Sequence, residues 1–222
     1  MILRFGIDGG TTRPVMTLFS IGHSNIPADR FIGLLRGAGI AAVADVRTTP
    51  QSRHFPWFSR RTLETRLARD GIAYRYHGDA LGGRPRDPAL FRDGVADYEA
   101  MARRPDFQDG IARLIDEAAR GPVCMMCAER EPLDCHRCLL VARALAARGV
   151  AVGHILHDAT VEPHAATEAR LLRPAGDEAD LFAPGQNDRL AAAYRRRAQA
   201  VAYRAASGRQ AATTGRKRAR SR

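Results

Sequence analysis

The sequence contains no long hydrophobic run, few cysteines and almost no lysine. No stretch approaches the roughly 18 consecutive apolar residues that a membrane-spanning helix needs, which argues against a membrane protein. Four cysteines among 222 residues are too few for a disulfide framework. The N-terminus lacks a basic region followed by an apolar stretch, so we expect no signal peptide. We therefore expect a cytoplasmic protein with reduced thiols.

Positive charge is concentrated at the C-terminal end. Lys217 is the single lysine, and the formal net charge of +11 comes from arginine. Residues 184–222 hold 11 basic residues and one acid, so the preceding chain is almost neutral. We expect a basic tail over 184–222, with a helix near 190–206 and then a disordered end. Such a tail either binds nucleic-acid phosphates without sequence preference or is a solvated extension, and both readings stay open.

Short apolar runs alternate with helical patterns through the rest of the chain. The runs predict strands at 16–21, 40–46, 72–76, 122–128 and 150–156, and the patterns between them predict helices at 26–38, 59–70, 95–104, 106–119 and 134–148. This alternation is typical of a mostly parallel sheet covered on both faces. We expect a single three-layer, Rossmann-like α/β domain of about five strands over residues 16–183. Residues 1–15 are expected to be a non-native or disordered extension, with Met16 as the native start.

Polar residues follow the predicted strands, where open parallel sheets bind their ligands. Five of the seven histidines lie at such ends. The residues that we expect to share one site are His23 and Ser24 after the first strand, Asp45, Arg47, Ser52 and Arg53 at the second, Gly82 and Gly83 after the third, and Cys127, Glu129, Cys135, His136 and Arg137 at the fourth.

The order and spacing of these residues resemble the domain-of-unknown-function 488 family, DUF488. The resemblance rests on the segments Ile21-Gly22-His23-Ser24, Asp45-Val46-Arg47, Leu81-Gly82-Gly83, Cys127-Ala128-Glu129, Cys135-His136-Arg137 and His154-Ile155, together with Pro50, Ser52 and Arg53. It runs from about Met16 to Leu156. It implies a single α/β domain in which these positions form the shared site, and it implies no particular reaction.

The residue types favour an enzyme acting on an anionic ligand. Cys135 and His136 stand where a loop enters a helix, and the helix dipole there favours an anion and lowers a thiol pKa. We expect Cys135, His136 and Glu129 to carry the chemistry, with His23 and Asp45 in orientation or proton transfer. We expect Arg47, Arg53 and Arg137 to hold a phosphate or carboxylate, as in a nucleotide-like ligand, with Ser24, Ser52, Gly82, Gly83 and Cys127 also at the ligand.

Other readings of these residues stay open. Cys135 can simply pack, Asp45 and Arg47 can form a structural ion pair, and Glu129 can brace Arg137. A non-catalytic nucleotide- or nucleic-acid-binding module would use the same arginines with the basic tail. Phe55, Trp57 and Phe58 suit either a stacked base or a hydrophobic lid. A short motif at 5–12 resembles the first phosphate loop of sugar kinases and actin-like ATPases.

Metal and redox chemistry are the remaining alternatives. The spacing of the four cysteines resembles a zinc pattern, but Cys124 and Cys127 point to opposite faces of a strand and cannot share one ion. A smaller site of Cys127, Cys135 and His136 remains an alternative, as does a redox pair of Cys135 and Cys138. We assign no metal ligand and name no cofactor from the sequence.

Overall fold

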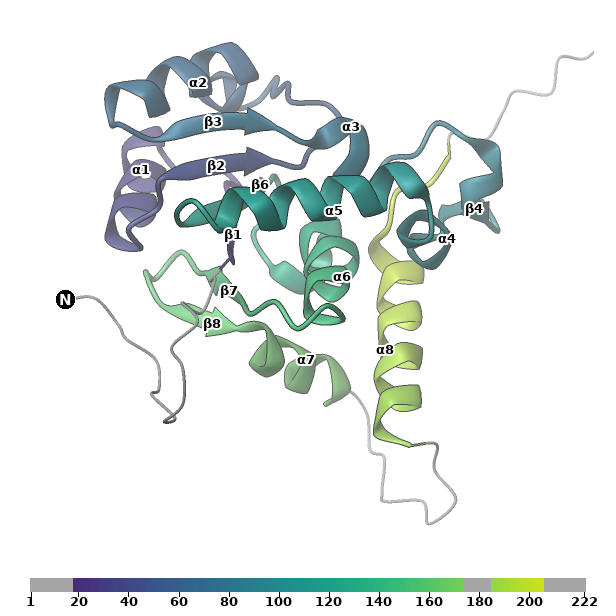
Figure 1. Cartoon of the computed structure of the whole chain (residues 1–222). Coiled ribbons are helices and arrows are strands. Elements are labelled where there is room, and N and C mark those ends of the chain that lie inside the picture. The colour runs from purple at the N-terminus through teal and green to yellow at the C-terminus, as the bar shows by residue number, and fades with distance from the viewer. Residues whose placement is uncertain (1–17, 174–184, 206–222) are drawn as a thin grey trace, which may run out of the picture.

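A computed structural model of the chain describes residues 18–173 and 185–205 (Figure 1). The predicted extension at 1–15, the motif at 5–12, Met16 and the end of the basic tail lie outside the described residues.

A six-stranded sheet forms the centre of the molecule, in the order β3-β2-β6-β1-β7-β8. The first five strands in this order run parallel, and β8 pairs antiparallel with β7. The predicted α/β fold with a mostly parallel sheet is therefore confirmed. The strands are β1 (Leu18–Gly22), β2 (Ala42–Asp45), β3 (Ala73–Tyr76), β6 (Val123–Cys127), β7 (Val152–Ile155) and β8 (Val161–Pro163).

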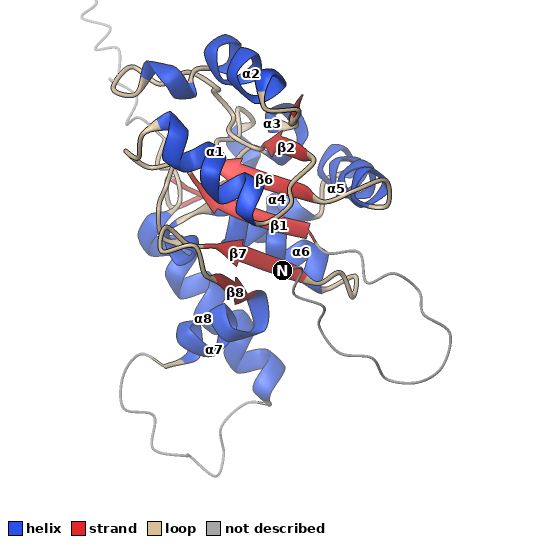
Figure 2. Ribbon diagram, turned by 90° about the vertical axis from the view of Figure 1, so that its left-hand side faces the viewer, coloured by secondary structure: helices blue, strands red, loops and turns tan. Residues whose placement is uncertain are grey.

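Helices cover both faces of this sheet (Figure 2). On one face, α1 (Ala28–Gly37) and α2 (Arg60–Arg69) enclose a core with Val43, Cys124 and Met126. The other face carries the larger core, covered by most of the remaining helices. These are α3 (Gly78–Leu81), α4 (Tyr98–Ala102), α5 (Pro105–Ala118), the π-helix η4 (Arg137–Ala142), α6 (Arg143–Ala146), α7 (His164–Leu172) and α8 (Gln186–Val201). None of the described helices is both long and apolar enough to cross a bilayer.

Several local predictions need correction. The sixth strand, β8, was not predicted, because it has only three residues and ends in Pro163. A second, two-stranded sheet is formed by β4 (Phe91–Arg92) and β5 (Val95–Ala96), and β5 takes the first residues of the helix expected over 95–104. The helix predicted from residue 59 begins at Arg60, and the Ser59 hydroxyl accepts from the Ser52 amide rather than from the helix.

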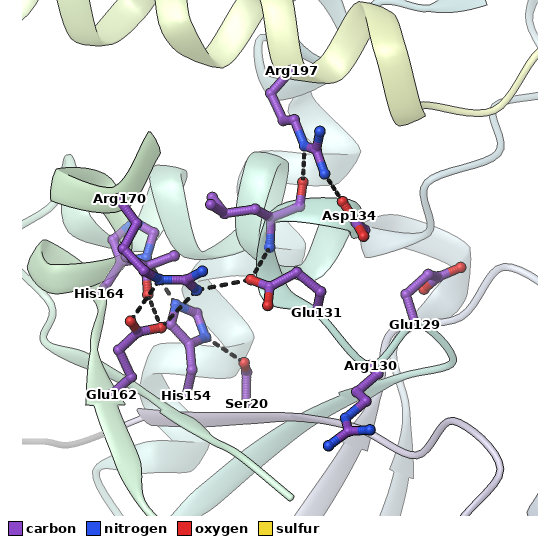
Figure 3. A network of polar contacts seen from close by, with 12 residues as sticks. Ser20, Glu129, Arg130, Glu131, Asp134, His154, Glu162, His164, Arg170 and Arg197 are labelled. Atoms are coloured by element: carbon purple, nitrogen blue, oxygen red, sulfur yellow. Dashed lines mark hydrogen bonds and ion pairs between the residues drawn. The ribbon is translucent and has the colours of Figure 1, made fainter. Parts of the chain in front are cut away.

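The helix predicted from Asp134 starts later. The 3-10 turn η3 (Pro132–Asp134) comes first, Cys135 is extended, and the backbone carbonyl of Cys135 accepts from the amides of Cys138 and Leu139. Asp134 pairs with Arg197 of α8 and does not cap the helix (Figure 3). The helix then opens as a π-helix, a form that is frequent at functional sites.

The C-terminal helix α8 packs against α7, η3 and η4 rather than standing apart from the body. It begins earlier than predicted and buries Ala193 and Tyr194 in the larger core. The chain beyond it runs beside β5, where the Ala96 amide donates to the Tyr203 carbonyl and the Ala205 amide to that of Gly94. Residues far apart in sequence therefore meet at the carboxyl edge of the sheet.

Candidate functional site

The carboxyl ends of β1, β2 and β6 meet at a pocket of about 440 Å³. Because β6 lies between β1 and β2, the three loops that follow these strands converge on one place. The pocket is lined by His23, Arg47, Thr48, Thr49, Gln51, Ser52, Arg53, Gly83, Arg84, Tyr98, Cys127, Ala128, Glu129, Asp134, His136, Val201 and Tyr203.

Eight of the thirteen predicted site residues line this pocket: His23, Arg47, Ser52, Arg53, Gly83, Cys127, Glu129 and His136. The other five are not among its lining residues. They are Ser24, Asp45, Gly82, Cys135 and Arg137.

Three side chains at the floor of the pocket and one beside them form what we call the pocket cluster: Cys127, Glu129 and His136 line the pocket, and Cys135 does not. The Oε2 atom of Glu129 lies 3.0 Å from the Sγ atoms of both cysteines. His136 Nδ1 lies 3.5 Å from the Cys127 sulfur and 3.8 Å from the Cys135 sulfur. Cys127 faces the pocket, whereas Cys135 sits behind it and is 2% exposed. The two cysteines are almost equally buried, at 3% and 2% exposed, so the predicted nucleophile Cys135 differs from Cys127 in not lining the pocket.

The four groups strongly influence one another's protonation. Burial would raise the pKa of Cys135, but the hydrogen bond from Cys127, the charge of Arg137 and the neighbouring His136 together hold it well below the usual value. Burial and the neighbouring Cys135 raise the pKa of Cys127. Burial also raises the pKa of Glu129, with the charge of Cys135 adding to it. These directions favour the thiolate form at Cys135 over the thiolate form at Cys127.

The ring of His136 has a fixed orientation. Its Nε2 lies 2.9 Å from the Val46 carbonyl oxygen, which can only accept, so Nε2 carries a hydrogen and Nδ1 points at the two sulfurs. Gly83 packs directly behind the ring, and a Cβ atom there would lie 2.6 Å from His136 Cγ. Burial alone would lower the pKa of His136, but the hydrogen bond and charge of Cys135 raise it.

Arg137 is buried beside the cluster and does not reach the pocket. Its side chain is 1% exposed, and its two terminal nitrogens donate to the carbonyls of Glu129 and Arg130 at 2.6 and 2.9 Å. Its Nε atom has no hydrogen-bond partner, and no ion pair joins it to a carboxylate among the described residues. The guanidinium braces the loop after β6 and faces the cysteines, which differs from the predicted ligand contact.

Asp45 and Arg47 form a buried ion pair under the pocket wall. Arg47 donates to both oxygens of Asp45, at 2.9 and 2.6 Å, and to the Phe58 carbonyl at 2.8 Å. The Tyr74 hydroxyl also donates to Asp45, at 2.7 Å. With these bonds made, Arg47 turns its remaining nitrogen, Nη1, toward His23 Nε2 at 3.2 Å. The pair therefore positions His23 at the pocket.

His23 is held as a neutral imidazole. Its Nδ1 donates to the Ser24 carbonyl at 2.8 Å, so Nε2 accepts from Arg47. The ring stacks on Phe58, with centroids 4.1 Å apart. Burial is the main cause that lowers the pKa of His23 to about 4, and the charge of Arg47 adds to it.

The rim of the pocket carries two exposed arginines. Arg53 follows Ser52, whose hydroxyl accepts from the Phe55 amide. The Arg84 guanidinium lies over the Tyr203 ring at 5.3 Å, and its backbone amide donates to the Thr48 hydroxyl. No carboxylate pairs with either guanidinium in the part of the chain that the structure describes. Both remain available to an anion in the pocket.

The two remaining predicted residues shape the backbone. Ser24 adopts a φ of 47° and donates its amide to the Ala128 carbonyl, joining the first loop to the one after β6. Gly82 has no room for a Cβ atom because Thr48 and the Gly78 carbonyl lie against it. Of the aromatic group, Phe58 is core, and Trp57 donates to the Ile26 carbonyl outside the pocket lining.

Several pocket residues were not predicted. Arg84 directly follows the predicted residue Gly83, and Thr48 directly follows the predicted residue Arg47. This adjacency in the sequence was the available signal. Tyr98, Val201 and Tyr203 carry no such signal, because they reach the pocket only through the packing of α4, the end of α8 and the segment after it.

The other two cysteines belong elsewhere. Cys124 lies in the core under α1 and α2, on the opposite face from Cys127, as the strand alternation predicts. Cys138 groups with His154 and His164, not with Cys135. The four-cysteine site therefore does not match the structure.

A second buried polar group, which we call the buried relay, lies near Cys138. It consists of Ser20, His154, His164, Tyr194 and Glu168. Figure 3 shows three of its members, Ser20, His154 and His164. The Tyr194 hydroxyl donates to Glu168 at 2.9 Å, so it accepts from His164 Nε2 at 3.0 Å. His164 Nδ1 then accepts from His154 Nε2 at 3.0 Å, and His154 Nδ1 accepts from the Ser20 hydroxyl at 2.6 Å. One direction of hydrogen bonding satisfies the whole chain.

The model of the family described as "Domain of unknown function DUF488" matches residues 27–144, about half of the chain. The chain belongs to the DUF488 family. No curated protein and no solved structure gives a significant match.

The DUF488 match includes β2, β6 and the whole pocket cluster. His23 and all five residues of the buried relay lie outside the matched residues, as does α8 with its contribution to the pocket.

Proposed function

We propose that this DUF488 protein is an enzyme that binds an anionic, phosphate-bearing or nucleotide-like ligand in the pocket and acts on it with the pocket cluster. One observation carries the proposal. A single pocket joins the exposed guanidinium groups of Arg53 and Arg84 at its rim to Cys127, Glu129 and His136 at its floor. Guanidinium groups suit phosphate and carboxylate oxygens, and the floor groups are those that proteins use for nucleophilic and acid–base steps.

The surroundings of the floor support chemistry rather than simple binding. Cys127, Cys135 and His136 are buried, so charges there interact more strongly than in water. His23 is held neutral with its Nε2 lone pair on Arg47. The Asp45–Arg47 pair, buried itself, keeps this wall rigid.

Ligand binding tests the first half of the proposal. Thermal unfolding of the full chain is followed with inorganic phosphate and with nucleoside 5′-monophosphates. A ligand at 100 times its Kd stabilises the fold by about 2.7 kcal/mol, which raises Tm by several degrees. The double variant Arg53→Gln/Arg84→Gln should lose this shift. Arg69→Gln, an exposed arginine on α2, is the matched control and should keep it. Equal shifts in both variants would contradict the proposed site.

Turnover tests the second half. A panel of phosphate-bearing compounds that stabilise the protein is incubated with it, and product is measured by chromatography. Cys127→Ala should abolish product formation while the ligand still raises Tm. If Cys127→Ala turns over normally, the pocket cluster does not carry the reaction.

A second function, nucleic-acid binding, is favoured by the basic residues that follow Tyr203 in the sequence. Residues 203–205 pair beside β5, and Tyr203 lines the pocket. Residues 206–222 include six basic residues and no acid. The basic residues follow the pocket residue Tyr203 directly in the chain, so they would add positive charge to a polynucleotide site at the pocket.

Anisotropy of a labelled single-stranded oligonucleotide tests this second function. Replacing Arg216, Lys217, Arg218, Arg220 and Arg222 by Gln should weaken binding and lower its salt dependence, by about 0.7 in the logarithmic slope for each phosphate that is no longer neutralised. An unchanged slope would show that the basic tail does not contact the oligonucleotide.

A further inference from the structure

We infer that the pocket cluster is a metal centre in which Cys127, Glu129, Cys135 and His136 hold one divalent, thiophilic transition-metal ion of the zinc type. The donor atoms of the four residues all lie within 4.8 Å of one another. Two thiolates, one imidazole and one carboxylate form a donor set that zinc accepts in tetrahedral geometry. With the usual bond lengths to zinc, tetrahedral sulfur and nitrogen ligands stand about 3.5 Å apart. The two sulfur–nitrogen distances here are 3.5 and 3.8 Å.

The orientation of His136 is the second observation. Histidines that bind metals usually donate their other ring N–H to a carbonyl or carboxylate, which fixes the ring and its tautomer. His136 donates Nε2–H to the Val46 carbonyl, and Gly83 holds the ring from behind. The lone pair of Nδ1 is thereby aimed between the two sulfurs before any ion arrives.

Charge balance is the third observation. Arg137 is almost fully buried, its guanidinium has only carbonyl partners, and no carboxylate pairs with it among the described residues. A buried cation is strongly unfavourable unless negative groups lie beside it, and the sulfurs of Cys135 and Cys127 are those groups here. A divalent ion bound by two thiolates and one carboxylate leaves the centre with a single negative charge. Arg137, directly behind the cysteines, balances that charge.

The position of the cluster gives the ion a role in the proposed function. Cys127, Glu129 and His136 line the pocket, and Cys135 closes the buried side. Catalytic zinc sites keep one coordination position open to water or substrate, often with three protein ligands. Glu129, on the loop after β6, is the ligand that a substrate oxygen can replace. This role rests on the proposed function, whereas metal binding itself does not.

The test uses the full chain, reconstituted with Zn²⁺ and separately with Co²⁺, with bound metal measured by elemental analysis. We expect one ion per chain. Cys127→Ser and Cys135→Ser should each reduce the bound metal at least tenfold. Cys138→Ser is the matched control, because Cys138 belongs to the other group of possible ligands, with His154 and His164. It should retain the metal.

The cobalt spectrum keeps the test decisive if a variant fails to fold. Thiolate-to-cobalt charge-transfer bands grow with the number of bound thiolates, and the pocket cluster supplies two where the Cys138 group supplies one. A wild-type spectrum of two thiolates supports the inference. No bound metal, a one-thiolate spectrum, or metal binding abolished only by Cys138→Ser overturns it. If metal is absent but phosphate still raises Tm through Arg53 and Arg84, the metal inference fails and the proposed ligand pocket stands.

Discussion

The pocket cluster and the buried relay contain similar side chains, yet the fold surrounds them differently. Both lie on the same face of the sheet and both include histidine and a carboxylate. In the buried relay every histidine nitrogen has a partner, and the chain ends at Glu168. The pocket cluster opens onto a cavity and has a buried arginine that, among the described residues, pairs with no carboxylate. Self-sufficient hydrogen bonding is typical of a structural network, and unbalanced charge beside a cavity is typical of a functional site.

The largest difference between the two regions should follow from removing Arg137. Arg137→Met leaves the Glu129 and Arg130 carbonyls without their donors and the cluster without its counter-charge. Breaking a buried charge interaction in this way destabilises proteins by about 3–5 kcal/mol. Urea unfolding measures the change in the free energy of unfolding.

A matched control on α5 separates this effect from that of an ordinary arginine replacement. Arg113→Met, on the exposed side of that helix, should change the free energy of unfolding by less than about 0.5 kcal/mol. If Arg137→Met also stays within about 1 kcal/mol of wild type, which is typical of an ordinary substitution, the cluster carries no charge for Arg137 to balance.

Acid should lower the free energy of unfolding, because His23 in the pocket wall becomes protonated when the chain unfolds. The pKa of His23 is about 4 in the fold and 6.5 when unperturbed, so the unfolded chain binds the proton more readily. Its contribution is fully present above pH 6.5 and is lost as the pH falls toward 4. The loss amounts to roughly 3 kcal/mol.

Denaturant unfolding between pH 4 and pH 8 isolates this contribution when wild type is compared with His23→Gln, which cannot titrate. The other buried histidines are common to both proteins and cancel in the difference. Wild type should lose more stability than the variant on acidification. Parallel curves would show that His23 does not carry the acid sensitivity.

A smaller effect should come from filling the space behind His136. Gly83→Ala places a Cβ atom 2.6 to 2.9 Å from the Cγ, Cβ and Nδ1 atoms of His136, so this side chain must shift. Overpacking of this kind destabilises by about 1–3 kcal/mol. Gly33→Ala, on the open side of α1, meets no atom within 4 Å and should stabilise slightly. Both are measured by thermal unfolding, and an unchanged Tm for Gly83→Ala would mean that the His136 ring is not confined.

The smallest effect is expected in the buried relay. Tyr194→Phe removes the hydroxyl between His164 and Glu168, but Glu168 Oε1 already lies 3.5 Å from His164 Nε2 and can replace it. In urea unfolding we expect a loss of about 1 kcal/mol, near the net value of one hydrogen bond. Tyr203→Phe, with an exposed ring, is the control for stability. A loss as large as that of Arg137→Met would show that the relay, too, depends on a charge.

The fold class could be predicted because it depends on local patterns. The strands β1, β2, β3, β6 and β7 overlap the predicted runs, since buried parallel strands are short apolar segments. The polar residues that follow these strands could also be predicted, because they are neighbours of the strands in the sequence. Short elements such as β5 and β8 could not, because two or three residues leave no periodic signal.

The membership of the site was decided by the tertiary structure. The insertion of β6 between β1 and β2 places Cys127 beside the loop that carries His23, more than 100 residues away. Helix packing turns Arg137 inward and directs Cys138 to His154 and His164 rather than to Cys135.

The sequence by itself determined which main elements form and which edge of the sheet carries the polar residues, because both depend on residues that are neighbours in the chain. Which side chains share a cavity, and which are only buried beside it, depends on strand order and long-range packing. Tyr203 shows the difference, since it reaches the pocket only because the chain after α8 pairs beside β5. No local pattern contains that information.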